Sequence, residues 1–512
     1  MINPITLIDD LLNRITMYRL VVYELLVLLA AALVLSLFGV LPYNPLYLIF
    51  STAFLFVVSW VVNKIFAFGF DTPSNHESVW ITALILALII APPSTWFDTA
   101  YLPLAFWAAS FAMASKYILA IRKKHILNPA ALGVAVTSLV LGLSATWWVA
   151  TPAMAYVALP GGLLIVRKLR RFDLFLAFNI VFALGIAFTA YTNGISLNNR
   201  AFLMQSFLFA PVIFFSTVML TEPLTTPPTR WLRILYGAFV AIMFLPDFNV
   251  ASFYFTPELA LLAGNIFSYL FSPKYKLALT LKRILQLSPD VFEFEFSPNR
   301  PVWFEPGQYM EWTCEHRKCD NRGIRRYFTL ASSPTEDTVK LGVKFYEPAS
   351  SFKKVLLSMK EGEAVMAGGL SGDFTLPKNG NQKLVFIAGG IGVTPFRSMI
   401  QYLLDNNEKR PITMLYANKT PNDAVYRELF DRARDLLGMK TVYAFDDKNV
   451  SPAPDVVSKI DPKTIRESVP DFAERLFYIS GPQGMVRAFK SMLIGMGVSR
   501  RRIKTDYFPG FA

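Results

Sequence analysis

The chain has 512 residues, of which 54% are hydrophobic and only 17% are charged. Soluble globular proteins carry about 25% charged residues, so this composition excludes disorder, collagen and coiled coil and favours membrane embedding. Two cysteines and three histidines are too few for a disulfide scaffold, a four-thiolate iron–sulfur cluster or two bis-histidine haems. The formal net charge is +13. The basic residues of the first half lie between apolar runs, which fits a membrane surface and argues against nucleic acid as a partner.

Apolar runs recur up to residue 272, and each is predicted to be a helix that spans the lipid bilayer. Ten such runs lie near residues 20–40, 45–66, 78–92, 100–120, 128–144, 147–166, 173–191, 201–220, 231–246 and 256–272. Nearly all basic residues of this half fall in loops on the side that holds both ends of the ten-span segment. The positive-inside rule therefore predicts a multi-pass inner-membrane protein with both termini cytoplasmic. Ten spans also permit two inverted repeats of five, with binding sites near the repeat interface.

Two polar clusters interrupt this apolar half, at residues 125–131 and 221–228. Prolines in both clusters remove helix hydrogen bonds, and the freed backbone groups are tolerable in a membrane where they line a cavity. An acidic residue beside the bilayer is a functional candidate. The predicted ligand-binding residues are Asn128, Thr221, Glu222 and Thr225. The alternative is a solvated loop with no ligand.

Five segments of this half resemble one membrane-protein family: residues 78–93, 124–133, 161–162, 221–225 and 263–265. That family comprises the D subunit of the Rnf electron-transport complex and the B subunit of the sodium-pumping NADH:quinone reductase. The resemblance covers roughly residues 15–275 and implies a flavin within the membrane domain. The family carries FMN on a threonine in the motif Asp-Gly-x-Ser-x-Ala-Thr, whose nearest match here, residues 142–146, is incomplete. A non-covalent flavin is therefore expected, with covalent attachment at Thr146 as the lesser alternative.

The pattern changes after Lys276. Residues 291–296 alternate with period two, as a half-buried strand does. Residues 306–309, 326–329 and 369–374 resemble the flavin lobe of the ferredoxin–NADP reductase superfamily, which implies an antiparallel barrel that binds FAD. In the motif Arg326-Tyr327-Phe328-Thr329, the resemblance implies that Arg326 pairs with the flavin pyrophosphate, Phe328 stacks on the isoalloxazine and Thr329 hydrogen-bonds near N5. Ser350 and Ser351 open a helix whose N-terminus can hold phosphate, with plain capping as the alternative.

A buried strand is predicted at residues 384–388, followed by a glycine turn and a helix, the order typical of a dinucleotide phosphate site. The residues of this turn are Gly389, Gly390, Gly392, Thr394 and Pro395. They resemble the nicotinamide lobe of the same superfamily, as do Ser480-Gly481-Pro482, expected beside the nicotinamide, and Asp506-Tyr507-Phe508, expected near the flavin. The implied catalytic residues are Phe328, Thr329, Ser480 and Phe508. Ser480 stands where many members have cysteine.

Together with the two resemblances, these patterns imply three domains: a transmembrane flavin domain (1–276), an FAD-binding barrel (277–380) and an NAD(P)-binding α/β domain (381–512). The expected protein is a membrane-bound flavoenzyme that oxidises NAD(P)H. It passes electrons from FAD to a second flavin (FMN or riboflavin) and then to a quinone or an outward-facing acceptor. The alternatives are a haem-type transmembrane ferric or oxygen reductase, using His76 and His125, and a transporter gated by a reductase domain. No metal site is expected, because Cys314, Cys319 and His316 supply three ligands at an unusual spacing. NADH and NADPH remain open alternatives, with Lys419 as a candidate for a 2′-phosphate contact.

Overall fold

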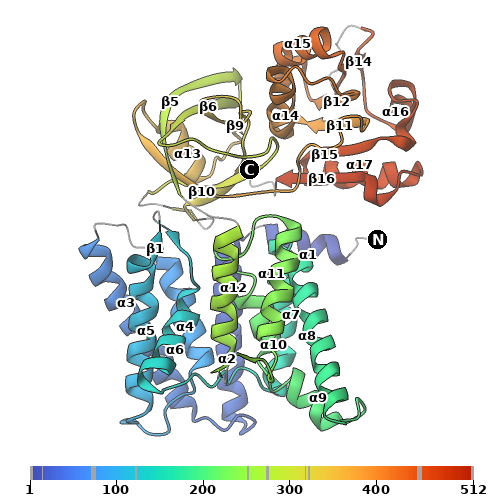
Figure 1. The fold of residues 1–512 in the computed structure, drawn as a ribbon. Coiled ribbons are helices and arrows are strands. Elements are labelled where there is room, and N and C mark those ends of the chain that lie inside the picture. Colours follow the sequence, from blue (N-terminus) through green and yellow to red (C-terminus); the bar gives the residue numbers. More distant parts are fainter. Residues whose placement is uncertain are drawn as a thin grey trace. The chain divides into compact units, whose positions relative to one another are not determined.

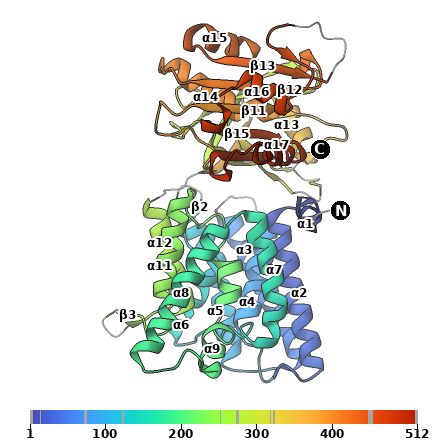
Figure 2. The ribbon, with the colours of Figure 1, turned by 90° about the vertical axis from the view of Figure 1, so that its right-hand side faces the viewer.

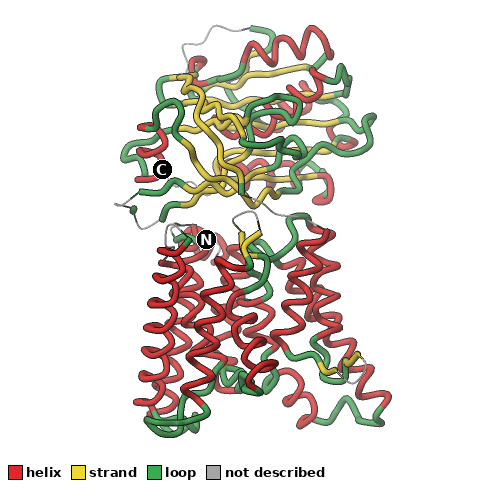
Figure 3. Tube along the Cα trace, turned by 60° about the vertical axis from the view of Figure 1, so that its left-hand side comes forward, coloured by secondary structure: helices red, strands yellow, loops and turns green. Residues whose placement is uncertain are grey.

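A computed structural model describes residues 4–13, 15–70, 76–121, 124–250, 253–271, 276–316, 319–320, 323–446 and 453–508. The chain divides into two compact units, Met1–Tyr275 and Lys276–Ala512. The first is almost entirely helical, whereas the second combines strands and helices (Figure 3). We call them the helical unit and the mixed unit, and each is described by itself.

Apolar helices lie side by side in the helical unit (Figure 1). In chain order they are α1 (Pro4–Asn13), α2 (Met17–Leu37), α3 (Pro45–Gly69), α4 (His76–Ile89), α5 (Tyr101–Ile118), α6 (Pro129–Leu141), α7 (Pro152–Leu169), α8 (Phe172–Thr192), α9 (Arg200–Phe207), α10 (Val212–Phe214), the π-helix η1 (Phe215–Met219), α11 (Arg230–Met243) and α12 (Pro257–Phe271). Two short hairpins join them, β1 (Ala120–Ile121) with β2 (Lys124–His125) and β3 (Asn249–Val250) with β4 (Phe253–Tyr254).

Each predicted apolar run contains a helix, but fewer helices than ten have the length and hydropathy of a membrane span. Among the described residues four pass this test: α2, α3, α7 and α8. A fifth is added if α9 and the α10–η1 segment, bent by 40° at a short break, count as one span. Helices α4 and α6 are apolar but shorter, with 14 and 13 residues. The composition thus predicts helices correctly, and the number of spans stays a prediction.

The first sheet of the mixed unit is antiparallel. Its strands are β5 (Leu277–Ser288), β6 (Val291–Pro298), β7 (Tyr309–Thr313), β8 (Arg325–Thr329), β9 (Val339–Lys344) and β10 (Ala364–Ser371), in the order β8-β7-β10-β5-β6-β9, and α13 (Ser351–Ser358) precedes β10. Strand β6 confirms the predicted strand. The expectation of a half-buried strand is wrong, because Glu293 and Glu295 are only 4% and 8% exposed. Both carboxylates accept hydrogen bonds from other elements, which makes their burial tolerable.

The second sheet is parallel and has helices on both faces (Figure 2). Its strands are β11 (Leu384–Gly389), β12 (Ile412–Asn418), β13 (Lys440–Phe445), β14 (Val456–Val457), β15 (Leu476–Pro482) and β16 (Ile503–Phe508), in the order β14-β13-β12-β11-β15-β16. Side chains of α14 (Thr394–Asp405) and α15 (Arg427–Leu437) pack on one face. Those of α16 (Pro462–Ser468) and α17 (Gln483–Gly495) pack on the other. The strand order reverses between β11 and β15, and such a switch point is where open α/β sheets bind ligands.

Candidate functional site

Strand β8 carries the predicted flavin motif. Arg326 and Phe328 are two residues apart and so share one face of the strand. Both meet the buried Phe352 ring of α13: the Arg326 guanidinium carbon lies 5.4 Å from its centroid, and the Phe328 ring centroid lies 5.7 Å away. Tyr327 is 40% exposed and makes an edge contact with Tyr309. The strand therefore presents an arginine and an aromatic ring together, as the motif predicts.

Thr329, the last residue of β8, is 2% exposed, and its Oγ1 has no hydrogen-bond partner among the described residues. A buried hydroxyl left without a partner is costly, and native proteins satisfy nearly all such groups. This orphaned hydroxyl fits a bound group that offers a polar edge, as the isoalloxazine of FAD does.

Arg326 and the N-terminus of α13 hold one anion, the Asp320 carboxylate. Asp320 Oδ2 accepts from the backbone N–H of Ser351 at 3.0 Å, and Oδ1 lies 3.5 Å from the Arg326 guanidinium. The Ser351 hydroxyl accepts from the Asp320 backbone N–H, and the Ser350 hydroxyl caps the helix by accepting from Lys353. Ser350 therefore caps the helix, whereas the Ser351 hydroxyl holds the Asp320 backbone. A carboxylate stands where a phosphate was predicted, which shows that this corner suits a negative charge.

The glycine turn and the Ser480-Gly481-Pro482 segment meet at the switch point between β11 and β15. A β-carbon on Gly392 would lie 2.5 Å from the Ser480 carbonyl oxygen, so only glycine fits this approach. Gly390 has φ +52°, a left-handed conformation that glycine adopts freely. The turn leads into α14, where Pro395 occupies the first turn and the Thr394 hydroxyl donates to the Ile391 carbonyl.

Ser480 is fully buried, and its Oγ has no hydrogen-bond partner among the described residues. Like Thr329 Oγ1, it is one of several orphaned hydroxyls among the described residues of the mixed unit, and it lies at the carboxyl end of β15. The side chain of Phe508, the fourth predicted catalytic residue, lies outside the described part of the chain.

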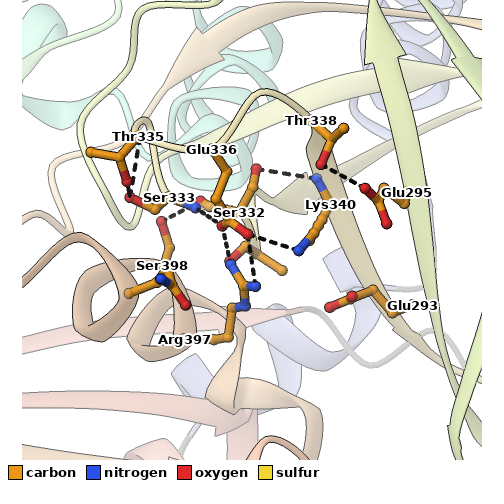
Figure 4. A network of polar contacts seen from close by, with 12 residues as sticks. Glu293, Glu295, Ser332, Ser333, Thr335, Glu336, Thr338, Lys340, Arg397 and Ser398 are labelled. Carbon is orange, nitrogen blue, oxygen red and sulfur yellow. Dashed lines mark hydrogen bonds and ion pairs between the residues drawn. The ribbon is translucent and has the colours of Figure 1, made fainter. Parts of the chain in front are cut away.

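A polar network joins the two sheets of the mixed unit (Figure 4). Arg397 of α14 pairs with Glu336 through Nη1 and Nη2, and Nη1 also donates to the Ala331 carbonyl at 3.1 Å. Ser398 donates to the Ser332 carbonyl at 2.6 Å, and Lys340 adds an ion pair of 2.7 Å to Glu336. Sequence reasoning missed this network. The available signal was an arginine within the apolar sequence of α14.

The Glu336 pair predicts acid-sensitive stability. Burial alone raises the pKa of Glu336, but bonds and charge from Arg397 and Lys340 outweigh it and bring the pKa below its ordinary value. The ionised form is therefore stabilised by folding, and this contribution is lost as the pH falls below the unfolded value of about 4.3. We expect Glu336→Gln to be less stable than wild type at pH 7, and the difference to shrink below about pH 4.3. Urea unfolding followed by flavin fluorescence measures it, and a constant difference would contradict the assignment.

In the helical unit, three of the four predicted ligand-binding residues come together. Asn128 Nδ2 donates to Glu222 Oε2 at 2.8 Å, and the Thr225 hydroxyl donates to the same oxygen at 3.2 Å. Asn265 extends the cluster, because its Oδ1 accepts from the Asn128 backbone N–H and its Nδ2 donates to the hydroxyl of Tyr236. Thr221 does not join, since its hydroxyl donates to the carbonyl of Thr217 in η1. Sequence reasoning missed Asn265 as a partner of Asn128.

The remaining candidates have separate surroundings. The Nε2 atom of His125 lies 3.6 Å from Glu222 Oε1, and the side chain of His76 lies outside the described part. The Thr146 hydroxyl donates to the Ile89 carbonyl at 3.5 Å. Within the described residues, no three His, Cys, Asp or Glu side chains gather as metal ligands.

The two cysteines are expected to differ sharply in reactivity. Cys314 is buried, and burial raises the pKa of its thiol to about 12, so little thiolate forms at neutral pH. Cys319 is exposed. Iodoacetamide at pH 7.5 should therefore label Cys319 and leave Cys314 unmodified in the folded chain. Peptide mass spectrometry checks this, with labelling in urea as the control. Equal labelling of both thiols in the folded chain would contradict the buried position of Cys314.

Comparisons with known proteins agree with this geometry. The sequence model of the oxidoreductase NAD-binding domain matches residues 386–491. The glycine betaine monooxygenase reductase subunit of Chromohalobacter salexigens is 27% identical over 233 residues, which are 44% of this chain and 62% of that protein. The phenol hydroxylase P5 protein of Acinetobacter pittii is 27% identical over 236 residues, or 45% and 64% of the two chains. This chain thus spans less than two thirds of these relatives.

Among solved structures, the Amycolatopsis cytochrome P450 reductase GcoB aligns with a TM-score of 0.41 at 23% identity, over 46% of this chain and 72% of that chain. The two sheets and the match to the NAD-binding domain define the class of the mixed unit: it is an oxidoreductase module with an NAD-binding domain at residues 386–491. More particularly, it is similar to the reductase subunits of bacterial oxygenases.

Proposed function

We propose that the chain is a membrane-bound flavoenzyme that oxidises NAD(P)H and delivers the electrons into its helical unit. The observation that carries the proposal is that two buried hydroxyls have no hydrogen-bond partner in the described part of the chain: Thr329 Oγ1 at the end of β8 and Ser480 Oγ at the end of β15. Each lies in one lobe, next to the motif expected to hold FAD or the nicotinamide. When bound, FAD supplies a two-electron acceptor for hydride.

The chain's own residues then have distinct tasks. Arg326 and the α13 N-terminus bind the pyrophosphate of FAD, Phe328 lines the ring system, and Thr329 offers its hydroxyl to the ring edge. Gly389, Gly390 and Gly392 let the backbone approach the pyrophosphate of NAD(P)H. Ser480 and Gly481 line the nicotinamide position from the neighbouring strand.

The helical unit is proposed to hold a second, non-covalent flavin near Asn128, Glu222 and Thr225, and to pass electrons to a quinone or an outward-facing acceptor. Support comes from the polar cluster itself, because Asn128, Thr225 and Asn265 are 4%, 3% and 1% exposed within an apolar helical unit. Polar groups of this kind in a membrane mark functional sites. In the proposed flavin-bound state, polar groups at the edge of the ligand replace the hydrogen bonds that these side chains now make to one another. We place the unit in the inner membrane with both termini cytoplasmic.

Flavin extraction from the purified full-length chain tests the proposal. We expect two flavins per chain, FAD and a second FMN or riboflavin, and NADH or NADPH should bleach the flavin absorbance. Asn128→Ser should lower only the second flavin, because serine keeps the α6 cap but removes the amide that bonds Glu222.

Other results would point elsewhere. FAD as the single flavin would favour direct quinone reduction by FAD, and a Soret band would favour the haem-type reductase. Solute uptake into proteoliposomes without NAD(P)H would favour the transporter. A flavin-loaded chain that neither NADH nor NADPH bleaches would contradict the enzyme assignment.

A further inference from the structure

Two consecutive residues of α14 bond directly to the segment that follows β8. Arg397 donates to the carbonyl of Ala331, and Ser398 donates to the carbonyl of Ser332. Ala331 and Ser332 lie two and three residues beyond Thr329, the last residue of the flavin strand. Arg397 and Ser398 lie in the first turns of α14, directly after the glycine turn. These two hydrogen bonds thus connect the end of the flavin motif to the start of the helix that follows the glycine turn (Figure 4).

Further contacts hold the Arg397 side chain rigidly in this position. Arg397 is 7% exposed, and its guanidinium forms a two-pronged pair with Glu336. Glu336 is itself held by the backbone N–H of Ser333 at 2.7 Å and by Lys340. A planar guanidinium fork fixes both distance and orientation, which a lysine ammonium cannot do.

A second contact between the lobes lies beside the first. The Tyr426 hydroxyl donates to Glu293 Oε2 of β6 at 2.8 Å, and its ring lies 5.9 Å from the Arg397 guanidinium carbon. Tyr426 has φ +64°, a left-handed conformation that a tyrosine rarely adopts and that the surrounding structure must hold. At Gly342 of β9 a β-carbon would lie 2.8 Å from Thr394 Cγ2, so the flavin sheet closely approaches the start of α14.

We infer that Ser332, Glu336, Arg397 and Ser398, here called the interlobe clasp, set the spacing between the nicotinamide and the flavin. The clasp residues are positioning residues, which act through the backbone at Thr329 and at the glycine turn. The inference rests on the proposed NAD(P)H oxidation. Hydride transfer needs reacting atoms about 3–3.5 Å apart, and a 1 Å misplacement costs roughly 100-fold in rate. The clasp therefore governs the rate of transfer, whereas binding of either cofactor depends on other residues.

Arg397→Lys in the full-length, FAD-loaded chain tests the inference by two measurements. Rapid mixing with saturating NADH or NADPH gives the limiting rate of flavin reduction, which should fall ~10-fold or more with unchanged FAD content and half-saturating concentration. Hydrogen–deuterium exchange should rise in residues 330–336 and 394–400. The control is Asp471→Asn, which removes the charge that pairs with Arg475 at 2.6 Å and with Lys383 at 2.8 Å inside the nicotinamide lobe, and it should change neither measurement.

Ser398→Ala serves as the second variant if Arg397→Lys does not fold. It removes one hydrogen bond and should slow flavin reduction a few-fold, on the order of 3-fold, with faster exchange in residues 330–336. Wild-type exchange in these segments, or a wild-type limiting rate in Arg397→Lys, would overturn the clasp. A wild-type chain that NAD(P)H does not reduce would instead overturn the proposed function, and the exchange measurement would still decide whether the clasp joins the lobes.

Discussion

Replacing Gly392 with alanine is expected to slow flavin reduction by NAD(P)H by ~100-fold or more while FAD content stays at the wild-type level. The new β-carbon would lie 2.5 Å from the Ser480 carbonyl oxygen and 2.5 Å from Gly481 Cα. Both neighbours are backbone atoms and cannot rotate away. Strands β11 and β15 would have to separate at their carboxyl ends, where the nicotinamide is expected. Anaerobic mixing of the FAD-loaded variant with NADH or NADPH, followed by flavin absorbance, measures the effect.

Gly495→Ala is the matched control, because among the described residues no atom outside its own helix backbone and chain neighbours lies within 4 Å of the position that its β-carbon would take. It ends α17, where alanine is compatible with helix. We expect a wild-type rate of flavin reduction. If Gly392→Ala also reacts at the wild-type rate, the glycine turn does not hold the nicotinamide, and the site must lie elsewhere in the mixed unit.

The glycine turn could be predicted because its signals are local in the sequence. A buried strand, a turn of glycines and an apolar helix follow one another within residues 384–405, and their order alone defines the motif. The interlobe clasp has no such signal. Arg397 and Glu336 are 61 residues apart, and their pairing depends on how two sheets pack. The same reason explains the unexpected burial of Glu293, whose partner Tyr426 is 133 residues away.

In the helical unit, too, contacts between residues far apart in the sequence could not be predicted. Hydropathy predicts where its helices lie, because every residue of a lipid-facing or buried helix contributes to the pattern. It does not predict which polar groups meet. Asn128 bonds to Glu222 and to Asn265, 94 and 137 residues along the chain. Glu258 was not predicted as a site residue, although it is 1% exposed and accepts a hydrogen bond from the indole N–H of Trp147 at 3.0 Å.

The phosphate site at α13 stays a prediction, and the structure adds an acidic residue to it. The sequence pattern identified Arg326, Ser350 and Ser351, which do gather at the end of the flavin motif. It did not identify Asp320, because a lone aspartate in a polar insert has no periodic or motif context. Asp320 nevertheless sets the electrostatics of the corner, since its carboxylate lies 3.5 Å from the Arg326 guanidinium and accepts a hydrogen bond from the backbone N–H of Ser351.

Arg326→Ala is therefore expected to weaken FAD binding by about 10- to 100-fold, because a hydrogen bond to a charged group contributes about 1.5–3 kcal/mol. The guanidinium is oriented by the carbonyls of Gly323 and Arg325, at 3.1 and 2.6 Å, so its direction is set before any ligand arrives. Its removal also leaves the Asp320 carboxylate to repel the flavin pyrophosphate. Titration of the apoprotein with FAD, followed by flavin fluorescence, measures the affinity.

Two further variants make this test specific to charge at that corner. Asp320→Asn keeps the shape of the side chain but removes the negative charge that competes with a pyrophosphate, so FAD should bind more tightly than in wild type. Arg325→Ala removes the neighbouring arginine, whose guanidinium lies 3.8 Å from the Glu311 carboxylate, so affinity should hardly change. Opposite shifts for the Arg326 and Asp320 variants would establish an anion site for the flavin phosphates. Equal loss in the Arg325 and Arg326 variants would mean that general positive charge attracts FAD and that Arg326 has no specific role.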